Sequence, residues 1–129
     1  DMLGVTGAEK PEPARIFMHG QPTFKFAVKA VPYCIDQVLE KAVMAIEDVD
    51  FFVFHQANAR IIDLAAKKYH IPPEKYYKNI QKYGNTSAAS IPLVISELHD
   101  LGKVGPGSRV LLVGFGGGLT WGGALVEFA

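Results

Sequence analysis

The stretch DFFVFHQANARIIDLAAKKY, residues 50–69, decides the fold class. Residues 51–54 form a continuous apolar run with the length and composition of a buried strand. Apolar residues then recur at helical spacing on one face, at Ile61, Ile62, Leu64 and Ala65. A fully apolar strand followed at once by an amphipathic helix is typical of a parallel sheet covered by helices.

The same alternation extends in both directions along the chain. We expect helices at residues 24–43, 58–69 and 87–101, and strands at residues 15–19, 50–54, 76–80, 109–115 and 119–129. Pro32 lies inside the first helical pattern and predicts a kink or a late helix start, because it removes a backbone donor. In the last helix, Ser87 is the expected cap, Pro92 is tolerated near the start, and Gly102 ends the helix.

The order of these elements, β-α-β-α-β-α-β-β, predicts an α/β fold. Parallel strands need crossover connections, so we expect a mixed five-stranded sheet with helices on both faces. The glycines at residues 116–118 predict a tight reversal, so the last strand is expected to pair antiparallel. Residues 1–15 mix Gly, Pro and charge, and they predict an irregular arm connected to a single domain at residues 16–129.

The composition indicates one compact domain, and it does not point to nucleic acid or a membrane as a partner. The chain has 129 residues, 49% of them hydrophobic, and its 13 basic residues balance 13 acidic ones. No net charge therefore draws it to nucleic acid or to an anionic membrane. Its only cysteine, Cys34, cannot form an internal disulfide, and no apolar run approaches the roughly 20 residues of a membrane-spanning helix. We expect a cytoplasmic protein that is not embedded in a membrane.

Three notable features come after the carboxyl ends of expected strands. His55 follows the second strand, Asn85 follows the third, and the glycines at 116–118 follow the fourth. Sheets of this kind gather functional groups beyond the carboxyl ends of their strands. Each feature also has a simpler interpretation: a packed histidine at a strand end, an ordinary turn or capping asparagine, and a glycine hairpin.

Four segments carry a family resemblance: MHGQPTFKFAV (18–28), VFHQANARII (53–62), YGNTSAASIP (83–92) and GFGGGLTWGGALVEF (114–128). In this order they resemble the C-terminal half of β-ketoacyl-acyl-carrier-protein synthase III, a condensing enzyme with a thiolase-like fold. The similarity covers nearly everything after Ile16. It implies an acyltransferase of fatty acid biosynthesis that condenses malonyl-carrier protein with an acyl-CoA primer and releases carbon dioxide.

The resemblance assigns His55 and Asn85 to catalysis. In this family a cysteine takes the acyl group, and a histidine and an asparagine then help to decarboxylate malonyl-carrier protein. Loss of carbon dioxide leaves an enolate on the thioester oxygen, and two aimed N–H donors stabilise that charge. Phe115, Gly116 and Gly117 match the oxyanion and cavity region beside the acyl-cysteine.

A further set of residues matches the family's binding region for the carrier protein and CoA. Its members are Gln56, Ala57, Asn58, Ala59, Arg60, Gly20 and Lys25. Arg60 is the leading candidate, because its planar guanidinium can bind either an acidic helix of the carrier or a CoA phosphate. For Lys25 and Lys67 an ordinary solvated helix face is an equal alternative. Gln21 stands where the family often has asparagine, which departs from the pattern.

The resemblance also implies what this chain lacks. The family's nucleophilic cysteine belongs to the N-terminal half, so we expect the isolated chain to be inactive in condensation. Its expected partners are that half, acyl-carrier protein, a CoA thioester and a second copy in a homodimer. Cys34 lies in the apolar stripe of a helix and is interpreted as structural. The scattered histidines show no ligand spacing, so we expect no metal and no resident cofactor.

Two other functions stay open at this point. The chain would suit a non-catalytic module that binds acyl-carrier protein or pantetheine, and it would equally suit a relative that serves polyketide synthesis. The intact set of His55, Asn85 and the glycine hairpin favours the enzyme.

Overall fold

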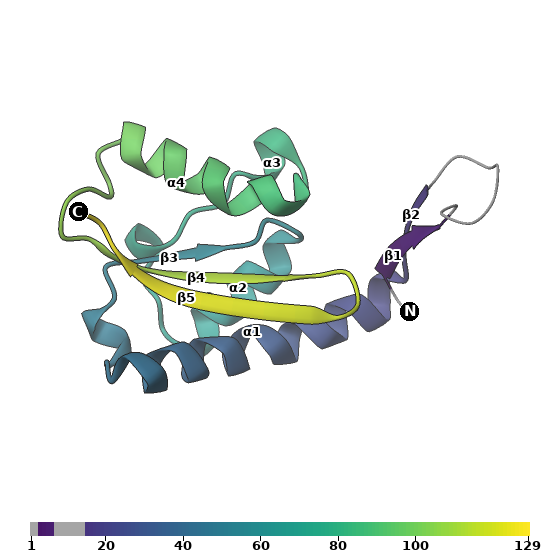
Figure 1. The fold of residues 1–129 in the computed structure, drawn as a ribbon, viewed down its shortest axis with the longest axis horizontal. Coiled ribbons are helices and arrows are strands. Elements are labelled where there is room, and N and C mark those ends of the chain that lie inside the picture. The colour runs from purple at the N-terminus through teal and green to yellow at the C-terminus, as the bar shows by residue number, and fades with distance from the viewer. Residues whose placement is uncertain (1–2, 7–14) are drawn as a thin grey trace.

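The structure is a computed structural model that describes residues 3–6 and 15–129. Its main sheet has three strands in the order β3-β4-β5 (Figure 1). Strand β3 (Phe51–Phe54) pairs parallel with β4 (Arg109–Gly116), and β4 pairs antiparallel with β5 (Thr120–Glu127). The predicted antiparallel last strand is confirmed.

Helices cover both faces of this sheet, as predicted. Helices α1 (Gly20–Ala42) and α2 (Ala59–Lys68) lie on one face, and α4 (Ser90–Asp100) lies on the other (Figure 1). Between α2 and α4 comes the single turn α3 (Ile80–Tyr83). Three short 3₁₀ turns complete the main body, at Ile46–Asp48, Pro73–Lys75 and Ser87–Ala89.

Alternation along the strands divides the core into two layers. Phe52 and Phe54 of β3 pack with α1 and α2, whereas Phe51 and Val53 pack with α4. Successive side chains of a strand point to opposite faces, so a strand that is apolar on every residue fills both layers. All four residues of β3 are buried. The apolar run at residues 51–54 therefore predicted the centre of the fold correctly.

The prediction of a five-stranded sheet is wrong for the described residues. Residues 76–80 form no strand, and Tyr76 makes only an isolated parallel bridge to Phe52. Strand β2 (Arg15–Met18) does form, but it pairs with β1 (Leu3–Thr6) in a separate two-stranded sheet.

The N-terminal segment is also more regular than expected. The prediction of an irregular arm at residues 1–15 is wrong for Leu3–Thr6, which form β1 and pair antiparallel with β2. Residues 7–14 of that arm lie outside the described residues. The β1–β2 hairpin extends beyond the first turn of α1 (Figure 1).

Local predictions for the helices were partly wrong. Helix α1 begins at Gly20 and continues through the buried Pro32, so the late start is wrong. Leu64 in α2 is 44% exposed rather than part of the apolar face. Ser87 does not cap α4, because Ala89 occupies the cap position and Ser87 belongs to the preceding 3₁₀ turn with a φ of 54°. Gly102, with a φ of 68°, follows the end of α4 as expected. Within the described ranges, none of the helices is both long and apolar enough to span a bilayer.

Helix α1 packs closely on β5 because Gly123 has no side chain. A Cβ at Gly123 would collide with the Cys34 sulfur, lie 2.9 Å from Val38 Cγ2 and lie 3.0 Å from the Leu112 carbonyl oxygen. Cys34 is fully buried, and burial raises the pKa of its thiol. The structural interpretation of Cys34 is thereby confirmed.

We expect Gly123→Ala to destabilise the fold by about 1–3 kcal/mol, because overfilling a close-packed contact forces the backbone or neighbouring side chains to shift. Urea unfolding followed by circular dichroism measures this difference. Gly122→Ala is the matched control, since a Cβ there meets nothing within 4 Å. Equal unfolding midpoints for the two variants would show that α1 and β5 do not need the close approach.

Candidate active site

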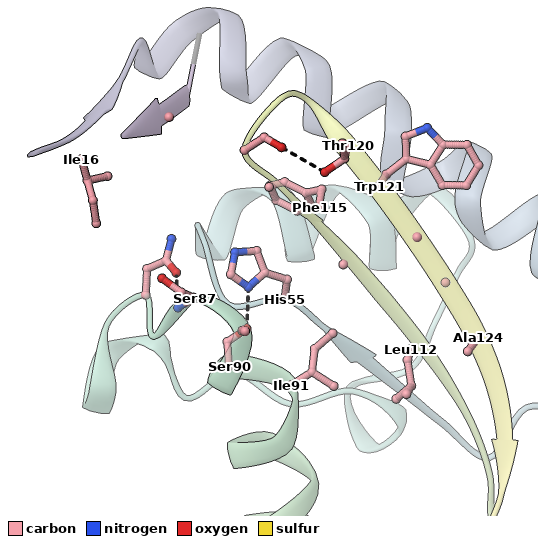
Figure 2. A pocket seen from close by; sticks show the side chains of 18 residues that line it. Ile16, His55, Ser87, Ser90, Ile91, Leu112, Phe115, Thr120, Trp121 and Ala124 are labelled. Atoms are coloured by element: carbon pink, nitrogen blue, oxygen red, sulfur yellow. Dashed lines mark hydrogen bonds between the residues drawn. The ribbon is translucent and has the colours of Figure 1, made fainter. Parts of the chain in front are cut away.

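A cavity of about 790 Å³ opens at the carboxyl ends of β3 and β4 (Figure 2). Its wall combines the end of β3, the first turn of α4, the β4–β5 hairpin and part of the N-terminal hairpin. Among its lining residues are His55, Asn85, Ser90, Phe115, Gly116 and Gly117. The prediction that His55, Asn85 and the glycine-rich turn gather at one rim of the sheet is confirmed.

His55 is fixed by the strand that precedes it. Its backbone N–H donates to the Val113 carbonyl at 2.8 Å, which continues the pairing of β3 with β4 by one residue. The imidazole stands edge-on to the Phe115 ring, with the ring centres 5.2 Å apart. Burial lowers the pKa of His55 and so favours the neutral form of the ring. Phe115 thus lies beside the cavity as predicted.

One side of the His55 ring is already occupied by Ser90. The Nδ1 atom of His55 lies 2.5 Å from the Ser90 hydroxyl oxygen, and that oxygen also accepts the Gln56 backbone N–H at 3.4 Å. Ser90 is only 2% exposed. The other ring nitrogen lies on the side turned away from Ser90 (Figure 2). It is therefore the nitrogen that a ligand in the cavity can reach.

Asn85 contributes a carboxamide to the lining of the same cavity. It lies between α3 and the 3₁₀ turn Ser87–Ala89, and its side-chain oxygen accepts the Ser87 backbone N–H at 3.0 Å. Its Nδ2 atom has no hydrogen-bond partner within residues 3–6 and 15–129. Because the oxygen is held by the backbone, the amide N–H group is the part of Asn85 left to bind a ligand.

The glycine hairpin closes the cavity on the β5 side. Gly116 pairs with Thr120 across three turn residues, and Gly118 takes a φ of 77° that favours glycine. The Thr120 hydroxyl donates to the Gly117 carbonyl at 3.1 Å. Gly116 and Gly117 line the cavity, in agreement with their predicted position. An oxyanion-binding role for the Gly117 N–H stays a prediction.

Gln56 is an internal scaffold residue rather than part of a docking surface. It is 1% exposed, and its amide nitrogen donates to the carbonyls of Phe54 at 2.9 Å and Tyr77 at 3.3 Å. Its amide oxygen accepts the Asn79 backbone N–H at 3.1 Å. The Gln56 amide thereby makes hydrogen bonds to backbone groups of residues 76–80, which were expected to form a strand. The prediction that Gln56 contacts a carrier protein is wrong, because a buried side chain offers no contact.

The remaining residues of the predicted docking set lie at or near the surface. Asn58 caps α2 by accepting the Arg60 backbone N–H at 2.9 Å, and Ala57 and Ala59 flank it and are partly exposed. Arg60 is exposed, and its guanidinium lies 5.0 Å from the centre of the Phe24 ring. Lys25 and Gly20 on α1 are exposed too, as are Gln21 and Lys67. Carrier-protein and CoA binding by this surface stays a prediction.

Glu97 on α4 anchors the segment that leads to Asn85. The Asn79 side-chain nitrogen lies 3.4 Å from one Glu97 oxygen, and Lys82 Nζ lies 3.2 Å from the other. Hydrogen bonding to Tyr83 is the largest cause that lowers the pKa of Glu97, to about 2, with further hydrogen bonds from Tyr77, Lys82 and Asn79; burial opposes the shift. The ionised carboxylate thus holds residues 77–83 against α4.

This shift predicts how stability depends on pH. The folded-state pKa of Glu97 lies below the ordinary value of 4.5, so its contribution is complete above about pH 4.5 and is lost as pH falls towards 2. We expect the thermal midpoint of the wild type to exceed that of Glu97→Gln at pH 7, with the difference shrinking across this range. A difference that stays constant down to pH 2.5 would contradict a role for the ionised carboxylate.

The sequence analysis missed two features of the site: the contact of Ser90 with His55, and the role of the buried Gln56 as a scaffold residue. Ser90 lies 35 positions after His55, and Gln56 lies 21 and 23 positions before two of its partners. No local pattern carries contacts of that separation. Within the described part of the chain, no three potential metal-ligating His, Cys, Asp or Glu side chains form a group.

Comparison with known proteins places this geometry in a family. Residues 39–128 match the family model described as 3-oxoacyl-[acyl-carrier-protein] synthase III, C terminal. A β-ketoacyl-[acyl-carrier-protein] synthase III from Clostridium acetobutylicum is 46% identical over 115 residues, which are 89% of this chain and 35% of that protein.

Solved structures agree with the sequence matches. A β-ketoacyl-[acyl-carrier-protein] synthase III from Thermus thermophilus superposes with a TM-score of 0.92 and 40% identity, covering 99% of this chain and 42% of that one. A priming β-ketosynthase of the R1128 polyketide pathway superposes with a TM-score of 0.89 and 31% identity, covering 98% and 40% of the two chains. The chain spans about a third of the length of the Clostridium acetobutylicum protein. It belongs to the family of C-terminal domains of 3-oxoacyl-[acyl-carrier-protein] synthase III.

Proposed function

We propose that this chain is the C-terminal catalytic part of a 3-oxoacyl-[acyl-carrier-protein] synthase III. Its reaction is the decarboxylative condensation of malonyl-carrier protein with an acyl-CoA primer in fatty acid biosynthesis. The observation that carries the proposal is the cavity at the sheet rim, where the imidazole of His55 and the free amide of Asn85 line the same space. The family to which the chain belongs supports the same reaction.

The two donors act on the malonyl thioester. Cleavage of the bond to the carboxylate releases carbon dioxide and leaves its electron pair on the remaining fragment as an enolate. His55 donates through Nε2–H and Asn85 donates through Nδ2–H to the thioester oxygen that gains charge. Because this charge is much larger in the transition state than in the ground state, fixed donors lower the barrier instead of merely tightening binding.

The enolate carbon then attacks the acyl group. In this proposal the acyl group is carried by a cysteine of the N-terminal half, and attack forms the new carbon–carbon bond while the cysteine thiolate leaves. The hairpin with Phe115, Gly116 and Gly117 lines the same cavity and is suited to bind the oxygen of the acyl-cysteine through a backbone N–H. Cys34 has no part in this step, because it is fully buried in the core between α1 and the sheet.

The carrier protein is proposed to dock beside the cavity, on the exposed surface of α1 and α2. Arg60 and Lys25 supply positive charge there, and Arg60 is steadied by its contact with the Phe24 ring. A planar guanidinium suits both an acidic helix and a phosphate, so either the carrier or CoA fits this surface. Assembly as a homodimer is part of the same proposal.

Reconstitution tests the function directly. This chain is mixed with the purified cysteine-bearing N-terminal half of the enzyme, acetyl-CoA and malonyl-carrier protein, and acetoacetyl-carrier protein is measured by mass spectrometry. Product that appears only when both halves are present supports the proposal, and each half alone is the control. Carrier binding without turnover would instead favour a non-catalytic binding module.

A role in polyketide synthesis is the second candidate function. The superposition with the R1128 priming β-ketosynthase favours it, since the same half-fold operates in that protein. The same reconstitution separates the two pathways if the carrier protein is varied: turnover only with a polyketide carrier would assign the chain to that pathway.

A further inference from the structure

We propose that Ser90 is a positioning residue for His55: its hydroxyl donates to Nδ1 and thereby keeps the ring hydrogen on Nε2, the nitrogen that a ligand in the cavity can reach. The inference rests on the proposed function of His55 as an N–H donor to a thioester oxygen. It adds to that function the group, the Ser90 hydroxyl, that makes His55 a donor through Nε2.

The first support comes from the hydrogen-bond partners of the Ser90 hydroxyl. Within the described ranges, its oxygen has two of them: the Gln56 backbone N–H at 3.4 Å and Nδ1 of His55 at 2.5 Å. The Gln56 group can only donate, so Nδ1 is the one of the two that can accept the hydroxyl hydrogen. If Nδ1 carried a hydrogen, the buried hydroxyl would lose its acceptor, and an unpaired buried polar group is costly.

The second support is that both partners of the Ser90 hydroxyl are held rigidly. Ser90 is 2% exposed and is the first residue of α4, so its backbone belongs to a packed helix. Gln56 is 1% exposed, and its side chain makes three hydrogen bonds to backbone groups. The His55 backbone in turn continues the pairing of β3 and β4. The hydroxyl and the ring therefore meet in one fixed arrangement.

The tautomer matters because a neutral imidazole carries a hydrogen on only one of its two nitrogens. Burial lowers the pKa of His55 and so favours this neutral form. With the hydrogen on Nδ1, Nε2 would present a lone pair to the enolate oxygen and repel it. With the hydrogen on Nε2, the ring donates to that oxygen. The Ser90 hydroxyl selects the second state.

Nuclear magnetic resonance on this chain, without substrate, tests the assignment first. Long-range ¹H–¹⁵N correlations at about pH 8 report which nitrogen of a neutral histidine carries the hydrogen. The His55 signals are identified by their loss in His55→Gln. We expect a single tautomer with Nε2 protonated and Nδ1 accepting a hydrogen bond. A wild-type spectrum with Nδ1 protonated overturns the proposal without any variant of Ser90.

Two variants then connect the tautomer to the reaction. In Ser90→Ala we expect a mixture of tautomers in the spectrum and, in the enzyme assembled with its N-terminal half, a fall in kcat of about tenfold with KM nearly unchanged. Ser90→Thr keeps a hydroxyl and should restore both the single tautomer and most of kcat. Unchanged spectra and unchanged kcat in Ser90→Ala overturn the role. Because the spectra need no turnover, they decide the Ser90 assignment whether or not condensation is found.

Discussion

Replacing His55 with alanine should slow decarboxylation of malonyl-carrier protein by the assembled enzyme by about 10²–10³-fold, the usual cost of removing one oxyanion donor. The reason is geometric: the Nδ1 side of the ring binds Ser90, so the ring has a single nitrogen to offer the developing charge. Release of labelled carbon dioxide under single-turnover conditions measures this step separately from condensation.

The matched control for this change is His99→Ala. The His99 side chain is 73% exposed near the end of α4 and does not line the cavity. It should leave the rate of carbon dioxide release unchanged. If the two alanine variants lost activity to the same extent, the effect would reflect general destabilisation and the donor role of His55 would be untenable.

Asn85→Asp should cause an even larger loss, of at least about 10³-fold at pH 7. The replacement is nearly the same size and still accepts the Ser87 backbone N–H, so the local turn is retained. It nevertheless removes the amide donor and places a carboxylate where the enolate charge develops, and like charges repel. The measurement is again single-turnover release of carbon dioxide.

Asn85→Ala separates these two contributions. It removes the donor without adding charge, so its loss should stay near about 10²–10³-fold and below that of Asn85→Asp. Partial recovery of Asn85→Asp as the pH is lowered would identify the added charge as the cause of the difference. Activity of Asn85→Asp within tenfold of the wild type would rule out Asn85 as a donor to the thioester oxygen.

The parts of the fold that were predictable depend on local patterns. The apolar run at residues 51–54 predicted β3 because a strand buried on both faces must be apolar on every residue. The glycines at 116–118 predicted the reversal between β4 and β5, since a tight hairpin needs residues that tolerate positive φ. The meeting of His55 and the hairpin followed from the rule that parallel strands end at one edge of a sheet. Asn85 lines the same cavity although the strand predicted before it does not form.

The parts that were not predictable depend on contacts between distant residues. Residues 76–80 have the aromatic and branched composition of a strand, yet the Gln56 side chain occupies backbone groups of that segment. Gln56 itself reads as an ordinary polar loop residue, and its burial follows only once β3 and residues 77–79 are brought together. Ser90 gives no sequence signal either, because its role depends on a contact with His55, which lies 35 positions earlier in the chain.

The most direct test of the donor pair is a crystal structure of the assembled enzyme with a non-reactive malonyl thioester analogue. We predict that His55 Nε2 and Asn85 Nδ2 both lie about 2.7–3.1 Å from the thioester oxygen of the analogue, with Nδ1 of His55 still bonded to Ser90. An analogue whose thioester oxygen contacts only one of these nitrogens, or neither, would contradict the proposed mechanism.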